Sequence, residues 1–192
     1  MIARVIRKPR QTGIALACWM LALLSCGLAT PAQAVERQPG GRQESASPTI
    51  SNAPLRAAII LNIIRFVDFG TGESSEPLLL CVHHSADTIR AIAALDGQRV
   101  GRREVGHRAF DGDDASGCAV VYLGLADPTA IARIRRAGLL VIGDGAGFIE
   151  AGGTIGLVGT GKHLQFEANA QAARAARIKL SSKLLRLATR VR

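Results

Sequence analysis

The fold is decided by the stretch AVVYLGLADPTAIARIRRAGLLVI, residues 119–142. Its first five residues are continuously apolar, which is typical of a strand covered on both faces of a sheet. Asp127-Pro128 then supplies a strong helix start, because Asp can cap a helix and Pro is tolerated in its first turn. Gly138 is the expected end of that helix, and residues 139–142 are apolar again. The stretch therefore predicts a strand, a helix and a second strand parallel to the first.

The alternation of strands and helices extends towards the N-terminus. Residues 78–82, LLLCV, form another continuous apolar run of the kind expected in a central strand. Ser85 can cap a helix that ends at Gly97, and a weaker strand is expected near residues 99–105. Upstream, residues 55–68 predict a helix whose broad apolar stripe implies burial on most sides. This spacing predicts an α/β fold with a mainly parallel central sheet and helices on both faces.

The pattern changes in the C-terminal part of the chain. Residues 154–158 and 163–167 are strand-like runs joined by GTGK at 159–162, which predicts a C-terminal antiparallel hairpin. Residues 169–190 are expected to be helical with a break near 178–181. Basic side chains lie on one side of this last segment and leucines on the other. It packs on the core with a solvated basic face, or it contacts an acidic partner or anionic lipid.

The N-terminus has the order of regions found in an export signal. Four basic residues within the first ten precede an apolar run at residues 14–28, which is followed by AQA at 32–34. The run is too short and too interrupted to be a comfortable membrane span, so residues 1–34 are predicted to be a signal peptide. Cys26 ends an LLSC string that is similar to a lipoprotein cleavage box, but Leu24 fits that box poorly. Cleavage after residue 34 is therefore preferred, and the protein is expected in the periplasm.

The predicted mature chain consists of a linker and one domain. Residues 35–51 are rich in Gln, Gly, Pro, Ser and Arg with few large apolar residues, which predicts a disordered linker. Residues 52–192 have the length of a single domain. Without residues 1–34 the chain keeps 20 basic and 15 acidic residues, a net charge of +5. This moderate charge, the few aromatics and export all argue against a nucleic-acid partner.

Two cysteines, Cys81 and Cys118, lie outside the predicted signal peptide. An even pair in an oxidising compartment predicts one disulfide. Closing a loop of that length contributes about 3 to 4 kcal/mol in the chain-entropy model. The alternative is a pair of buried free thiols, because Cys is often a small core residue.

The motifs that would indicate catalysis are incomplete. GLVGTGKH at 156–163 nearly matches a phosphate-binding loop, but His163 stands where that loop needs Ser or Thr, and a strand follows instead of a helix. GDGAG at 143–147 lacks the spacing of a dinucleotide-binding loop. SSK at 181–183 misses the S-x-x-K spacing, and the sequence has no G-x-S-x-G elbow. We therefore expect no catalytic residue, no cofactor and no enzyme activity.

The histidines and acidic residues do not have metal-ligand spacing. The four histidines form no metal-binding pair, and residues 111–114 lack the order of a calcium loop, so no metal site is expected. His83 and His84 follow directly after a predicted strand, however, and ligands bind at the carboxyl ends of parallel strands. This leaves an alternative function open, namely a periplasmic small-ligand-binding protein that uses the strand ends near His83, Gly143 and Asp144.

Six strings, in this order and spacing, resemble the YfiR-type family of periplasmic repressor proteins from about residue 52 to the end. The strings are LRAAIILNIIRFV at 55–67, PLLLCV at 77–82, GCAVVYL at 117–123, GFIEAGGTI at 147–155, FEAN at 166–169 and LSSKLLRLA at 180–188. The resemblance implies an α/β domain, often dimeric, that binds the periplasmic sensor domain of an inner-membrane diguanylate cyclase and holds that enzyme inactive. Release of the repressor would raise cyclic di-GMP and favour biofilm formation.

The family pattern agrees with the predicted disulfide and differs from this chain in two places. It pairs cysteines at the positions of Cys81 and Cys118. Phe69-Gly70 stands where the family usually has Trp-Pro, and a second cysteine pair found in some relatives is missing near residues 145–153. The missing pair puts redox control by a second bridge in doubt, whereas the expected fold is unaffected.

A repressor that acts by binding needs an exposed patch that fits its partner. Phe148, Ile149 and Glu150 lie in the loop before the predicted hairpin, where an exposed aromatic and aliphatic pair beside glycines would suit such a patch. They are the expected partner-binding residues. The alternative is that Phe148 packs under its own loop. The expected partners are the sensor domain of a membrane diguanylate cyclase and, in a homodimer, a second copy of the chain.

Overall fold

The computed structural model describes residues 52–72, 74–112, 114–125 and 127–192. The predicted signal peptide and linker, residues 1–51, lie outside the described residues.

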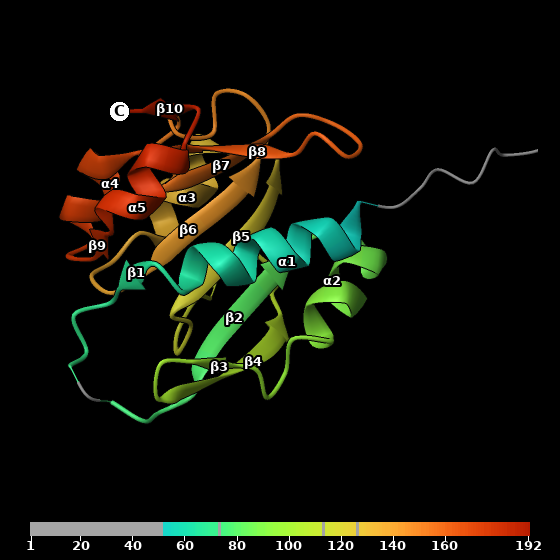
Figure 1. Ribbon diagram of the computed structural model, residues 1–192, viewed down its shortest axis with the longest axis vertical. Helices are drawn as coiled ribbons and strands as arrows, with labels where there is room; N and C mark the ends of the chain where they lie inside the picture. Colours follow the sequence, from blue (N-terminus) through green and yellow to red (C-terminus); the bar gives the residue numbers. More distant parts are fainter. Residues whose placement is uncertain (1–51, 73, 113, 126) are drawn as a thin grey trace, which may run out of the picture. The chain divides into compact units, whose positions relative to one another are not determined.

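Helices and short strands alternate along the described part of the chain (Figure 1). The helices are α1 (Ala53–Ile64), α2 (Ala86–Ala93), α3 (Pro128–Ile134), α4 (Ala170–Ala175) and α5 (Ser182–Leu187). The strands are β1 (Val67–Asp68), β2 (Leu78–His83), β3 (Arg99–Val100), β4 (Arg103–Ala109), β5 (Val120–Leu125), β6 (Leu140–Asp144), β7 (Ile155–Val158), β8 (Gln165–Ala168), β9 (Lys179–Leu180) and β10 (Arg190–Val191).

One sheet organises the described residues, with eight strands in the order β10-β8-β7-β6-β5-β2-β4-β3. The five strands from β7 to β4 in this order run parallel to one another. β3 pairs antiparallel with β4, and β8 forms an antiparallel hairpin with β7. The predictions of an α/β fold, a mainly parallel sheet and a C-terminal hairpin are therefore confirmed.

Side chains of the central strands alternate between two hydrophobic clusters, one on each face of the sheet. On β5, Val120 and Tyr122 belong to the cluster beneath α1, α4 and α5, whereas Val121 and Leu123 belong to the cluster covered by α3. This period of two is the normal geometry of a strand, and burial of both faces explains why the strand is continuously apolar. The predicted helices on both faces are present.

Two side-chain caps fix where α2 and α3 begin. The Ser85 hydroxyl accepts a hydrogen bond from the Thr88 amide, and Asp127 Oδ1 accepts from the amides of Thr129 and Ala130. Each cap satisfies amide groups that would otherwise lack a partner in the first turn. Both helix starts therefore lie at the carboxyl ends of strands, α2 after β2 and α3 after β5.

The first helix is shorter than predicted. It ends at Ile64, because Val67 and Asp68 form strand β1 and pair antiparallel with β9. Its apolar stripe is also narrower, since Leu55 is exposed at the surface. The weak strand predicted at 99–105 is in fact two strands, β3 and β4, joined in a hairpin.

The C-terminal segment matches the predicted helix with a break. The break is strand β9 between α4 and α5, and the chain then adds β10 to the edge of the sheet. Among the helices in the described ranges, none is both long enough and apolar enough to cross a membrane.

Candidate ligand-binding cleft

The strand order reverses direction between β2 and β5. From β2 the chain passes through α2 and β3 to β4 on one side, and then returns to β5 on the other side of β2. The helix after β5 packs on the opposite face of the sheet from α1. The loops after β2 and β5 therefore diverge, which creates the crevice in which open α/β sheets bind ligands.

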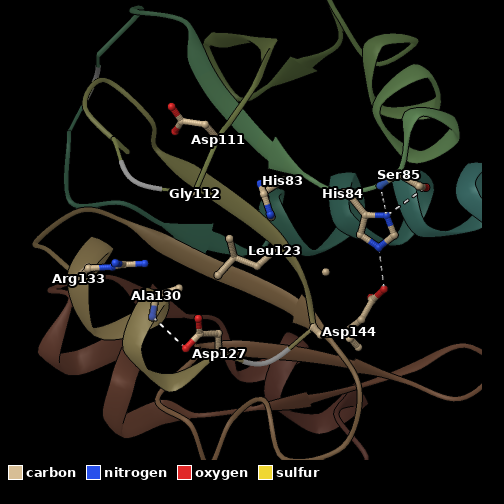
Figure 2. Close-up of a pocket in the computed structure, with 12 residues that line it drawn as sticks. His83, His84, Ser85, Asp111, Gly112, Leu123, Asp127, Ala130, Arg133 and Asp144 are labelled. Carbon is tan, nitrogen blue, oxygen red and sulfur yellow. Dashed lines mark hydrogen bonds and ion pairs between the residues drawn. The ribbon is translucent and has the colours of Figure 1, made fainter.

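A cleft of about 870 Å³ lies at this point, which is within the size range of small-molecule sites, roughly 300 to 1,000 Å³ (Figure 2). Its lining comes from the ends of β2, β5 and β6, the loops after β2, β4 and β5, and helix α3. The lining residues are His83, His84, Ser85, Asp111, Gly112, Leu123, Gly124, Leu125, Asp127, Ala130, Arg133 and Asp144.

Asp144, the last residue of β6, is the centre of a hydrogen-bond network at one end of the cleft. Its side chain is 13% exposed. It accepts hydrogen bonds from Arg56 Nε at 3.1 Å, from His84 Nε2 at 3.0 Å and from the Tyr122 hydroxyl at 2.8 Å. These donors come from α1, from the residue after β2 and from β5. A half-buried carboxylate is stable here because one positive charge and two further donors surround it.

Tyr122 acts in this network as a protonated donor. Its ring is fully buried in the core. Burial raises the pKa of the Tyr122 hydroxyl well above its ordinary value, and the neighbouring charge of Asp144 and the hydrogen bond to it raise this pKa further. The hydroxyl therefore keeps its proton and donates it to the carboxylate.

His84 is held in one tautomer. The Ser85 amide donates to His84 Nδ1 at 2.7 Å, so Nδ1 is the acceptor and Nε2 carries the proton that is donated to Asp144. The imidazole also stacks on the Tyr122 ring, with centroids 5.2 Å apart and planes inclined by 14°. The imidazole and the carboxylate line the cleft, and the buried phenol of Tyr122 supports both from the core.

Ser85, His84 and Asp144 include the residue types of a hydrolytic triad, but the arrangement does not activate the serine. Ser85 Oγ lies 3.2 Å from His84 Nδ1. The single lone pair of that nitrogen already accepts a hydrogen bond from the backbone amide of Ser85. The hydroxyl itself contacts Thr88 as the cap of α2. A serine nucleophile needs a free general base within reach, and His84 does not offer one in this geometry.

His83 faces the middle of the cleft, and one of its two ring nitrogens already makes a hydrogen bond within the protein. Its Nδ1 lies 2.9 Å from the carbonyl oxygen of Phe110. A carbonyl only accepts, so Nδ1 carries the proton and Nε2 of the neutral ring is an acceptor. Figure 2 shows the His83 ring between the loop of Asp111 and Gly112 and the side chain of Leu123.

The rest of the cleft lining includes exposed charges and an exposed leucine. Asp127 and Arg133 belong to the start and the body of α3, and Asp111 lies in the loop that follows β4. Leu125, at the end of β5, is 84% exposed. The cleft therefore combines carboxylates, a guanidinium, imidazoles and an apolar lip. In the described ranges, no group of three or more His, Cys, Asp or Glu side chains could hold a metal ion.

The predicted partner-binding patch is wrong as an exposed surface. Phe148 and Ile149 are both 0% exposed. The Phe148 ring packs under its own loop against Gly143 and Gly153, where a Cβ atom at either glycine would overlap the ring. The glycines beside Phe148 therefore make room for a core side chain and do not indicate a binding loop.

Glu150, the third residue of that prediction, is exposed. It forms an ion pair with Arg190, which also binds Glu167 at 2.8 Å. The hydrogen bond from Arg190 lowers the pKa of Glu150. This pair ties the loop after β6 to the terminal strand β10.

The predicted disulfide is present. Cys81 on β2 and Cys118 before β5 are bonded, with Cα atoms 5.9 Å apart. Both residues are buried in the cluster on the α3 face. Arg108 Nη2 lies 3.4 Å from the Cys118 sulfur and donates to the carbonyl oxygen of Ser116 at 3.1 Å. The disulfide therefore links β2 to the residues just before β5, and the Arg108 side chain lies beside it.

The structure places two residues of the ligand-binding alternative, His83 and Asp144, in the cleft lining together with His84. Its third residue, Gly143, is buried against the Phe148 ring and is not among the lining residues. The other two histidines lie elsewhere, since His107 contacts Asp96 on β4's side of the sheet and His163 lies in the β7–β8 hairpin. The near match to a phosphate loop is thus a hairpin turn.

Sequence reasoning missed Arg56, Tyr122 and the role of Asp127 in the cleft. One signal was available. Tyr122 is the polar residue within an otherwise apolar strand, and a buried hydroxyl requires a partner. No local pattern indicates that this partner is Asp144, or that Arg56 reaches it from a helix 88 residues away.

Comparison with known proteins identifies a family and a solved structure with low similarity. The model of the YfiR/HmsC-like family matches residues 53–189. A crystal structure of a conserved domain protein from Vibrio cholerae O1 biovar eltor matches with a TM-score of 0.46 and 14% identity. That match covers 74% of this chain and 60% of the Vibrio protein, so it spans less than two thirds of that protein. No curated protein matches the chain.

Proposed function

The chain belongs to the YfiR/HmsC-like family, and from this membership we propose that it is a periplasmic regulatory protein that represses an inner-membrane diguanylate cyclase. It acts by binding the periplasmic sensor domain of the cyclase and so lowers cyclic di-GMP and biofilm formation. The observation that carries the proposal is the family match over residues 53–189, nearly the whole of the described chain. The N-terminal order of basic, apolar and small residues supports export to the compartment in which a sensor domain is accessible.

The proposed mechanism is stoichiometric. A membrane cyclase with active and inactive states shifts towards the state to which the repressor binds more tightly. The size of the shift depends only on the difference between the two affinities. The repressor therefore needs a stable scaffold and a complementary surface, and it needs no reactive group.

An apolar groove between α1, β8 and α5 is the surface that we assign to the sensor domain. It has a volume of about 320 Å³. Leu187 at its edge is 62% exposed. The apolar residues that line it are Ile59, Ile63, Phe66, Leu164, Phe166, Leu184 and Leu187. Ile63 and Leu184 form its buried floor, Leu187 is exposed and the other four are partly exposed. Apolar side chains that are partly exposed beside one another favour a protein contact.

The charges at the rim of this groove support a partner of opposite charge. The Lys183 ammonium lies 5.1 Å from the centre of the Phe66 ring. Arg65 and Arg186 are exposed on the adjoining turns of α1 and α5. A segment that carries an apolar anchor flanked by Asp or Glu fits such a rim, because opposite charges steer association and reject other partners. We assign that segment to the cyclase sensor.

Affinity capture tests this function. Tagged protein is incubated with detergent-solubilised membranes of the native host, and the retained membrane proteins are identified by mass spectrometry. The expected result is one protein that combines a periplasmic sensor with a diguanylate cyclase domain. Leu187→Asp should abolish capture. Leu125→Asp, which alters a still more exposed leucine at the ligand cleft, should retain capture. Capture that does not depend on Leu187 would contradict the assigned surface, and absence of a cyclase would contradict the function.

The cleft at the ends of β2 and β5 supports a second proposed function. We propose that this cleft binds a small ligand in the periplasm, either as a separate activity or as a signal to the repressor. Its support is its position at the point where the strand order reverses and the convergence of His83, His84 and Asp144 on it. Titration of the purified protein with small molecules tests this function without any cyclase.

A further inference from the structure

The cleft at the ends of β2 and β5 has a polar lining in which hydrogen-bond acceptors predominate. Three carboxylates, Asp111, Asp127 and Asp144, line it, against one guanidinium, that of Arg133. Arg56, from outside the lining, offsets the charge of Asp144. With neutral histidines, the described charges of the cleft and Arg56 together leave a net negative charge, which favours a cationic ligand.

Asp127 has acceptor capacity that the fold does not use. Its Oδ1 accepts the amides of Thr129 and Ala130 and so caps α3. Its Oδ2 accepts no hydrogen bond from any described residue, and the side chain is exposed to the cleft. A carboxylate has about four lone-pair sites, so a ligand donor can bind Oδ2 without disturbing the cap.

His83 supplies a second acceptor in the middle of the cleft. Because its Nδ1 proton is committed to the Phe110 carbonyl, the Nε2 lone pair of the neutral ring has no partner among the described residues. The same bond fixes the ring in place. A ligand N–H group pointing at this nitrogen would therefore gain a hydrogen bond with little loss of side-chain freedom.

Apolar surface adjoins these acceptors. Leu123, Leu125 and Ala130 belong to the lining. An exposure of 84% for Leu125 is high for a large aliphatic residue at a strand end. A short hydrocarbon chain that packs against Leu125 would remove that apolar surface from water, which favours binding.

From this lining we infer that the cleft binds a small aliphatic amine in its ammonium form. The ammonium group donates to Asp127 Oδ2 and the alkyl chain lies against Leu125, while His83 Nε2 is a separate acceptor for a further N–H group of the ligand. This inference rests on the small-ligand function proposed above and names its ligand class. An aliphatic dicarboxylate of the same length would meet carboxylates and an imidazole lone pair, and should be rejected.

Calorimetric titration of the purified full chain tests the ligand class. The probes are butylamine, 1,4-diaminobutane and succinate at pH 7.5. We expect saturable binding of both amines, with a rise in the melting temperature, and no binding of succinate. Asp127→Asn should weaken amine binding about tenfold, because a charged hydrogen bond becomes a neutral one. The Asn side chain keeps the helix cap, so the fold is preserved.

A matched control separates this effect from general charge loss. Glu104→Gln removes an exposed carboxylate at the amino end of β4. The cleft lies at the carboxyl ends of the parallel strands, so this residue is distant from it. It should leave amine binding unchanged. Failure of both amines to bind saturably, tighter binding of succinate, or an unchanged Asp127→Asn variant would overturn the inference. Each of these outcomes leaves the capture of a cyclase unaffected, so this inference and the repressor function fail separately.

Discussion

His84 Nε2 donates to Asp144 Oδ2 across 3.0 Å, although 60 residues separate them in the sequence. The bond joins the end of β2 to the end of β6 over the intervening strand β5, whose Tyr122 donates to the same carboxylate. Arg56 adds helix α1 to this contact. Residue 144 is therefore the point at which the wall of the cleft, the core and the first helix meet.

Loss of the Asp144 charge should destabilise the fold. In Asp144→Asn, Arg56 keeps its charge while its side chain is only 19% exposed, and the hydrogen bonds from His84 and Tyr122 become neutral ones. We expect the free energy of unfolding to fall by about 2 to 3 kcal/mol, as measured by urea denaturation. Asp96→Asn, which affects the more exposed contact with His107, should cost less than about 1 kcal/mol. Equal costs for the two variants would contradict the central role of Asp144.

Tyr122 should resist ionisation in the native state. Its pKa in the fold is raised, whereas in the unfolded chain it is ordinary, near 10.0. Above pH 10 the unfolded state loses this proton and the native state keeps it, so the stability contributed is full below pH 10 and declines as the pH rises further. The chain has one tyrosine, so its ultraviolet phenolate absorbance reports this residue alone.

The expected spectra follow from that difference. Native protein should show no phenolate absorbance at pH 10 to 11, and urea-unfolded protein should titrate near 10. The stability difference between the wild type and Tyr122→Phe should narrow as the pH rises above 10. A native titration near 10 would show that the hydroxyl is accessible to water and not held by Asp144.

The disulfide should supply a large share of the stability. Cys81 and Cys118 are 37 residues apart, and a loop of that length corresponds to about 4 kcal/mol in the chain-entropy model. The double variant Cys81→Ala/Cys118→Ala should therefore unfold at a much lower urea concentration than the oxidised protein. Reduction of the wild type should have a similar effect. An unchanged unfolding midpoint would contradict this contribution.

Phe148 should behave as a core residue. Phe148→Ala leaves a cavity between Gly143 and Gly153, and we expect it to cost about 3 to 5 kcal/mol. Glu150→Gln, two positions further along the same loop, removes an exposed ion pair and should cost less than about 1 kcal/mol. A small effect of Phe148→Ala would contradict the burial of the ring. Loss of partner binding in this variant would reflect unfolding and not a lost contact.

The sequence predicts the strands and helix starts of this fold well, because those features are local. The apolar runs that contain Leu80 and Val121 require burial on both faces of a sheet, and Ser85 and Asp127 each cap the helix that was predicted to start after them. The end of α1 was misjudged because Val67 is used in a pair with Leu180, and that partner is distant in the chain. Helical periodicity does not contain this information.

Only part of the candidate site can be predicted from the sequence, because the rest depends on contacts between residues that are distant in the chain. The position of His83 after a buried strand indicated a ligand edge, and the structure places it in the cleft. The exposure of Phe148 was misjudged because glycines next to an aromatic occur both in binding loops and where a ring needs space. The deciding neighbour, Gly153, lies across a turn whose path the local sequence does not specify.

The most direct test of the central claim is the diguanylate cyclase activity of membranes that carry the captured cyclase, measured as cyclic di-GMP formed with increasing amounts of the purified protein. Repression by binding predicts that activity falls and reaches a minimum near one molecule of the protein per sensor domain, that Leu187→Asp leaves activity high, and that Leu125→Asp represses as the wild type does. Cyclase activity that stays unchanged when the sensor domain is saturated with the protein would contradict the account.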